Sequence, residues 1–133
     1  DWLYVDDHCE AIWTILQNSE VGESYNIGGG NQPPNIEIVK TICDILDKSV
    51  GTPEDKCHAD LVQFVKDRPG HDRRYAMDIT KIKNELGWQP KFDLEQGLYK
   101  TVDWYLGHTD WLNAIIKEKE YQNWVQINYQ GRE

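Results

Sequence analysis

The chain has 133 residues, which is enough for one domain with a hydrophobic core. Its 14 lysines and arginines stand against 23 aspartates and glutamates, giving a formal net charge of −9. This balance disfavours nucleic acid and anionic membranes as partners, because both are bound chiefly through their phosphates. No apolar stretch is long enough to span a bilayer, and neither a methionine nor a signal peptide opens the sequence. We therefore expect a cytoplasmic fragment of a longer protein.

The first expected elements are a helix and a short strand. Asp6 can cap a helix whose apolar residues share one face: Cys9, Ile12, Trp13 and Leu16. Residues 24–27 have the composition of a strand and are followed by three glycines at 28–30. These glycines lack the spacing of a dinucleotide-binding loop, and no helix opens directly on them. We expect them instead to let the backbone pass close to another segment.

The next expected helix follows Asn35 and covers residues 36–48. Its apolar residues form a broad face that should be buried: Ile38, Val39, Ile42, Cys43, Ile45 and Leu46. Asn35 stands at the N-cap position, where its side chain can bind the first backbone N–H groups. The start of a helix also favours anions, so Asn35 could serve as a cap, as a ligand-binding residue, or as both.

A run of charged residues at 67–75 is the strongest candidate for a binding loop. It holds three of the four arginines in the chain and follows a predicted strand at 61–65. Pro69 and Gly70 predict a sharp turn that directs Arg68 and His71 towards one point. A guanidinium offers a planar fork of donors that suits phosphate, so the implied ligand is an anion. The alternative is a solvated loop whose arginines pair with the neighbouring acids.

The remaining chain is predicted to be helical. Asp78 can cap a short helix that Gly87 closes, and Asp93 should cap the longest helix of the chain. A further helix and an aromatic tail follow. Trp104 and Trp111 are expected to be packing residues and not a platform for stacking a sugar.

The three cysteines indicate free thiols. Cys9, Cys43 and Cys57 are an odd number without close pairing, and the first two lie among apolar residues at helical spacing. We expect buried thiols in a reducing compartment, with neither disulfides nor a metal site.

Several stretches resemble one enzyme family. Residues 67–76, Asp-Arg-Pro-Gly-His-Asp-Arg-Arg-Tyr-Ala, resemble a segment of the dTDP-glucose 4,6-dehydratases, which belong to the extended short-chain dehydrogenase/reductase class. Further stretches are similar to that family in the same order, at residues 1–8, 25–29, 41–44, 85–90, 101–106 and 128–132. The stretches at 1–8 and 85–90 are shared more loosely with epimerases, so the narrower assignment depends on the arginine loop and the C-terminal tail.

The resemblance implies an α/β fold in which this chain is the C-terminal substrate-binding lobe of a Rossmann-type enzyme, mostly helical with short strands. Residues 1–30 would form a helix and strand packed against an NAD-binding domain outside this chain, and residues 31–133 would form the nucleotide-sugar lobe. NAD and the catalytic residues would belong to that other domain. The full-length enzyme is expected to be a homodimer.

The resemblance also implies which residues bind the substrate, dTDP-glucose or a related nucleotide-sugar. They are Asn35, Asp67, Arg68, Pro69, Gly70, His71 and Tyr129. Arg68 would fork onto the diphosphate with Asn35 nearby, His71 would reach phosphate or ribose, and Tyr129 would close one side. The alternatives are a related epimerase or decarboxylase, and a non-catalytic binding or assembly module.

Overall fold

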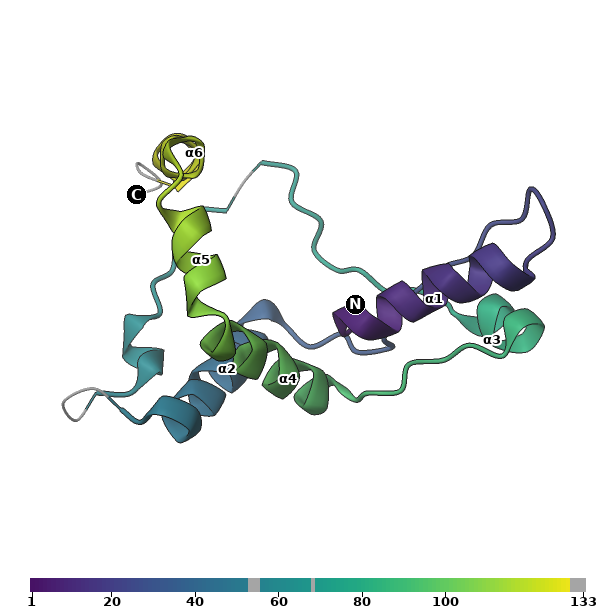
Figure 1. Cartoon of the computed structure of the whole chain (residues 1–133), viewed down its shortest axis with the longest axis horizontal. Helices are drawn as coiled ribbons and strands as arrows, with labels where there is room; N and C mark the ends of the chain where they lie inside the picture. The colour runs from purple at the N-terminus through teal and green to yellow at the C-terminus, as the bar shows by residue number, and fades with distance from the viewer. Residues whose placement is uncertain (53–55, 68, 130–133) are drawn as a thin grey trace.

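The computed structural model describes residues 1–52, 56–67 and 69–129, and of residue 129 it describes the backbone only. The described part is helical, and Figure 1 shows an open arrangement with α1 and α3 at one end and α2 and α4 at the other. None of these helices is both long enough and apolar enough to cross a membrane. The elements are α1 (Val5–Asn18), α2 (Asn35–Val50), the 3₁₀ helix η1 (His58–Leu61), α3 (Thr80–Leu86), α4 (Leu94–Gly107), α5 (Thr109–Ile116) and α6 (Lys119–Tyr129).

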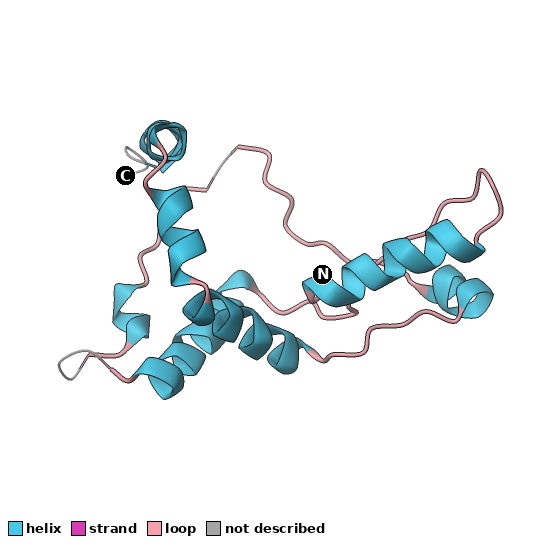
Figure 2. Cartoon of the chain, viewed as in Figure 1, coloured by secondary structure: helices cyan, strands magenta, loops and turns pink. Residues whose placement is uncertain are grey.

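The predicted strands do not occur in the described residues (Figure 2). The mostly helical character is confirmed, but the strands expected at 24–27 and 61–65 are not present. A strand needs the backbone of a neighbour for its hydrogen-bond ladder. Residues 24–27 are held by side chains instead, as Tyr25 donates its hydroxyl hydrogen bond to Glu85 over 2.9 Å. Leu61 ends η1, so the second expected strand begins inside a helical turn.

One core lies between α1 and α3. Its buried members are Ala11, Ile82 and Trp88, of which the first two have no exposed surface. The small side chain of Ala11 allows the short helix α3 to approach α1 closely. Gly87 ends α3 in the left-handed conformation, as the sequence predicts, with φ of 70°.

A buried carboxylate joins this core to the start of α4. Asp7 is 1% exposed, and its two carboxylate oxygens accept the backbone N–H groups of Lys91 and Phe92, each over 3.1 Å. Buried charges persist where hydrogen bonds satisfy them. Asp7 therefore fixes the segment that leads into α4.

The apolar face of α1 is open, with Ile12 43%, Trp13 60% and Leu16 73% exposed. Cys9, which was expected to be buried, is exposed on the same face. The helix buries the opposite side, because α3 packs there. Helix α1 also begins at Val5 and has Tyr4 as its N-cap, so the expected cap, Asp6, lies in the first turn.

A second packed region joins α2 to α4. Helix α2 buries Ile38, Cys43 and Ile45, and α4 buries Val102. Burial raises the pKa of the Cys43 thiol. All three cysteines are free, as expected, although Cys57 is exposed, like Cys9.

The helix after Asp93 was expected to be the longest of the chain, and this prediction is wrong. Helix α4 has 14 residues, whereas α2 has 16.

The predicted cap of α4 is confirmed. Asp93 accepts the backbone N–H of Gln96 over 2.8 Å, and the Gln96 side chain accepts the backbone N–H of Asp93 over 3.2 Å. This reciprocal pair is a capping box.

Trp104 in α4 and Trp111 in α5 meet edge to face, with ring centroids 5.2 Å apart, so they pack α4 against α5.

Candidate functional site

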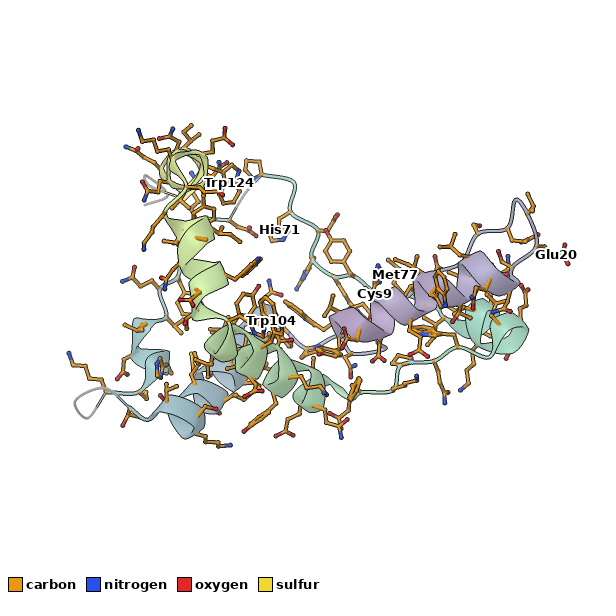
Figure 3. The ribbon with its side chains drawn as sticks, viewed as in Figure 1. Cys9, Glu20, His71, Met77, Trp104 and Trp124 are labelled. Carbon is orange, nitrogen blue, oxygen red and sulfur yellow. The ribbon has the colours of Figure 1, made fainter. Side chains whose placement is uncertain are left out.

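The charged loop and the start of α2 line one hollow of about 1000 Å³. Its lining comes from four parts of the chain: residues 1–2, 32–35, 67 and 71–75. Figure 3 shows His71 on the loop that runs from the side of α6 to the N-terminal end of α1. The hollow therefore brings together the predicted binding loop and the beginning of a helix.

The loop makes the turn that its sequence predicts. Gly70 has a φ of 70°, a conformation that glycine adopts without a steric penalty, and Pro69 precedes it in the same turn. After the turn, Nδ1 of His71 lies 2.6 Å from a carboxylate oxygen of Asp67. This contact fixes the histidine ring through Nδ1 and directs Nε2 elsewhere.

Arg74 connects the loop to the segment that precedes α2. Its Nε donates a hydrogen bond to Oε1 of Gln32 over 3.0 Å, and Nη2 contacts the same oxygen. The two residues lie 42 positions apart in the sequence. The contact therefore fixes one wall of the hollow relative to the other.

Of the glycines at 28–30, Gly29 lies against protein backbone, as expected, Gly28 lies against side chains, and Gly30 has open space beside it. A Cβ atom at Gly29 would overlap the carbonyl oxygen of Trp2, and one at Gly28 would lie 2.7 Å from Cβ of Met77. The backbone N–H of Gly29 also donates to the Asp1 carboxylate over 2.7 Å. The space that a phosphate would need is taken by the protein itself. These glycines do not fit the pyrophosphate of a dinucleotide cofactor.

The structure places three of the predicted binding residues on the hollow: Asn35, Asp67 and His71. Asn35 is the first residue of α2. Pro34 takes the N-cap position without a side-chain hydrogen bond, so Asn35 is not the cap that was expected. Arg68 lies outside the described residues. Tyr129 ends α6, and its side chain is likewise outside the description.

Two further residues at this site were not assigned from the sequence. Arg74 belongs to the arginine-rich run, which was a signal that could have indicated it. Gln32 carries no such signal, because its contact with Arg74 joins segments that only the fold brings together.

Comparison with known proteins defines the class. Residues 1–101 match the family model described as GDP-mannose 4,6 dehydratase, and the chain belongs to this family. Over all 133 residues it is 50% identical to the dTDP-glucose 4,6-dehydratase of Shigella flexneri and 50% identical to one of Escherichia coli. The resemblance to dTDP-glucose 4,6-dehydratases is thereby confirmed. The chain spans 36% of the length of these curated relatives.

Solved structures agree with this assignment. The dTDP-glucose 4,6-dehydratase of Bacillus anthracis strain Ames, in complex with NAD, matches with a TM-score of 0.70 and 45% identity, covering 84% of this chain and 32% of that one. The enzyme DesIV of Streptomyces venezuelae, with NAD and TYD bound, matches with a TM-score of 0.68 and 39% identity over the same shares. The helical arrangement described above is therefore part of a larger dehydratase structure in these relatives.

Proposed function

We propose that this chain provides the nucleotide-sugar-binding part of a dTDP-glucose 4,6-dehydratase. That enzyme converts dTDP-glucose to dTDP-4-keto-6-deoxyglucose and water. The observation that carries the proposal is the hollow, which joins the loop residues Asp67 and His71 to Asn35 at the start of α2. A helix start and a fixed imidazole are both suited to an anionic ligand such as a diphosphate.

Each binding residue has a proposed role. Arg68 forks onto the diphosphate, and Asn35 donates a side-chain hydrogen bond beside it. His71, held by Asp67 through Nδ1, offers Nε2 to phosphate or ribose. Tyr129 closes one side of the site. These groups hold the part of the substrate that does not react, and the binding energy they supply positions the sugar for chemistry elsewhere.

We assign NAD and the catalytic residues to a part of the enzyme outside these 133 residues. Gly28 and Gly29 have no room for a cofactor pyrophosphate, and the match covers only 32% of each of the two relatives solved with NAD. The chain alone should therefore form no product from dTDP-glucose and NAD. Detection of dTDP-4-keto-6-deoxyglucose by chromatography of a reaction with the pure chain would contradict this assignment.

We also propose that residues 1–30 pack against that other part. The exposed apolar stripe of α1 supports this, because monomeric proteins rarely leave such a surface open. The isolated chain should then self-associate or be marginally stable. Sedimentation velocity is the measurement, and replacing Trp13 and Leu16 by glutamate should shift the chain towards monomer. A monodisperse, highly stable wild-type monomer would contradict the proposal.

Calorimetric titration with dTDP tests the binding role. Arg68→Lys keeps the charge but loses the fork, so its affinity should fall by about 1–3 kcal/mol, and Arg68→Ala should lose more. Thymidine is the matched ligand without phosphate, and its binding should not depend on Arg68. A titration with GDP tests the choice of nucleotide, because the family model is described by a GDP-sugar and the curated relatives by a dTDP-sugar. We expect dTDP to bind more tightly than GDP.

Three results would redirect the proposal. Unchanged dTDP affinity in Arg68→Ala, with native-like thermal unfolding, would remove Arg68 from the site and favour a loop paired only with its own acids. Product analysis on the full-length protein that carries these residues separates a dehydratase from an epimerase or a decarboxylase. Binding without any turnover in that protein would favour a non-catalytic module.

A further inference from the structure

We propose that Cys43 and Cys57 form a reversible disulfide that ties α2 to η1 when the protein meets a peroxide. Both thiols are free in the structure, which therefore corresponds to the reduced state. Neither residue lines the hollow described above, so this inference goes beyond the proposed function and does not depend on it.

Helix α2 and η1 already lie against each other, and one carboxylate holds them together. Oδ1 of Asp47, near the end of α2, accepts the backbone N–H of His58 over 3.1 Å and also contacts Nδ1 of the His58 ring. The two side chains are only 18% and 19% exposed, so water competes little for these contacts. They fix the first residue of η1 beside the last turns of α2.

The two cysteines flank this contact. Cys43 lies one helical turn before Asp47, and residues four apart share a face of a helix, so Cys43 is on the side of α2 that meets η1. Cys57 directly precedes His58. Its backbone is fixed at both ends, because its N–H donates to the Asp60 carboxylate over 3.2 Å and its carbonyl oxygen accepts the Asp60 N–H over 3.0 Å. The fold therefore presents both thiols at one contact between α2 and η1.

The charges around Cys43 indicate the same proximity. Burial is the main cause that raises the pKa of the Cys43 thiol, and the negative charges of Asp47, Asp44 and Cys57 raise this pKa further. Interactions between charges weaken with distance, so an effect of Cys57 on Cys43 requires the two thiols to be near each other. This holds although α2 ends and η1 begins between them.

The two thiols differ in accessibility, which sets the order of the steps. Cys57 is exposed and can meet a peroxide, whereas Cys43 is only 8% exposed. The thiolate of Cys57 attacks one oxygen of hydrogen peroxide, and the O–O bond breaks. A sulfenic acid forms on Cys57, and the leaving hydroxide takes up the former thiol proton to give one water.

The second step closes the disulfide. The Cys43 sulfur attacks the Cys57 sulfur and gives up its thiol proton. The S–O bond of the sulfenic acid breaks, the S–S bond forms, and a second water leaves. The two thiols have then lost two electrons and two protons, and one peroxide has been reduced to two waters.

The bond adds a covalent link where packing already exists. A disulfide needs Cα atoms about 4.4–6.8 Å apart, which is a separation found between elements in direct contact. The link restricts the unfolded chain, so the oxidised protein should be the more stable form. Because η1 leads through residues 62–66 to the charged loop, the link also fixes the start of that segment to α2. The cysteine pair thus acts as a redox-sensitive clamp.

The test oxidises the dilute chain with one equivalent of hydrogen peroxide, blocks free thiols with N-ethylmaleimide, and maps the product by trypsin digestion and mass spectrometry. Cleavage after lysine puts each cysteine in its own peptide: Cys9 in residues 1–40, Cys43 in 41–48 and Cys57 in 57–66. We expect the peptides 41–48 and 57–66 to be joined in a monomeric product and to separate in dithiothreitol. The thermal midpoint of unfolding should rise by about 5–10 °C on oxidation and return on reduction.

Three serine variants assign the link. Cys57→Ser changes an exposed side chain and should fold as the wild type does, yet it should lose both the link and the rise in the thermal midpoint. Cys43→Ser should lose both as well. Cys9→Ser is the matched control, because Cys9 is also exposed. Figure 3 shows Cys9 on α1, which Figure 1 places at the opposite end from α2, so the link and the rise should remain in this variant.

Three results would overturn the inference. The first is a Cys57 oxidised to sulfenic or sulfinic acid while Cys43 stays a free thiol. The second is a link that includes Cys9 or joins two copies of the chain. The third is a lower thermal midpoint for the linked chain, which would show that the bond strains the fold. The experiment uses no nucleotide, so these outcomes leave the proposed function untouched.

Discussion

Replacing the buried carboxylate Asp7 should destabilise the chain far more than its single charge suggests. The side chain is 1% exposed and accepts two backbone N–H groups, from Lys91 and Phe92, at 3.1 Å each. A hydrogen bond to a charged group contributes about 1.5–3 kcal/mol, and a buried donor left without an acceptor adds a penalty. The two bonds do not add fully, because both depend on one carboxylate. We therefore expect Asp7→Ala to lower the free energy of unfolding by about 3 kcal/mol.

That loss is a large fraction of the roughly 5–15 kcal/mol that stabilises a typical domain. For a chain of this size it corresponds to a fall in Tm of about 10 °C. Asp7→Asn keeps one acceptor oxygen and should lose about half as much. Urea unfolding followed by tryptophan fluorescence is a suitable assay, because Trp88 is buried in the core beside this segment.

Glu10→Gln provides the matched control. Glu10 pairs with the side chain of Lys91 at 2.6 Å, but both side chains are well exposed, so the pair should contribute under about 1 kcal/mol. The two variants thus remove a buried and an exposed contact to the same residue. If Asp7→Ala costs no more than Glu10→Gln, the carboxylate does not hold the segment that leads into α4.

Three further predictions follow from individual contacts. Gly29→Ala should destabilise the chain by about 1–3 kcal/mol, because its Cβ would overlap a backbone carbonyl, whereas Gly107→Ala meets no atom and should be neutral or stabilising in thermal unfolding. Asp93→Ala removes the side-chain acceptor of the capping box, which binds the Gln96 N–H, and should cost about 1 kcal/mol in urea unfolding; no change would show that α4 does not need its cap. The hydrogen bond with the His58 ring holds the pKa of Asp47 below its usual range, so its stabilisation should be present above the ordinary aspartate pKa of about 3.9 and lost as the pH falls through the folded-state value. Urea midpoints of wild type and Asp47→Asn should therefore converge in acid, and a constant difference between about pH 5 and pH 3 would contradict this origin.

Local backbone chemistry could be predicted from the sequence. Asp93 caps α4, Gly87 ends α3, and Gly70 makes the turn of the charged loop, because each depends on the residue itself and on its immediate neighbours. The close approach of backbone expected at the glycines 28–30 occurs at Gly29, which lies against the carbonyl oxygen of Trp2. The family was also evident, because its motifs occur in order along the whole chain.

Pairings between distant segments were decided only by the tertiary structure. Helical periodicity shows that Ile12, Trp13 and Leu16 share a face, but not which face meets a neighbour; α3 packs against the side of Ala11 instead. The segment at 24–27 has strand composition, yet a strand exists only beside a partner backbone, and the described chain holds this segment by side chains. The contact between Arg74 and Gln32 joins residues 42 positions apart. No local pattern encodes such a contact, because it depends on how the loop and the start of α2 meet in space.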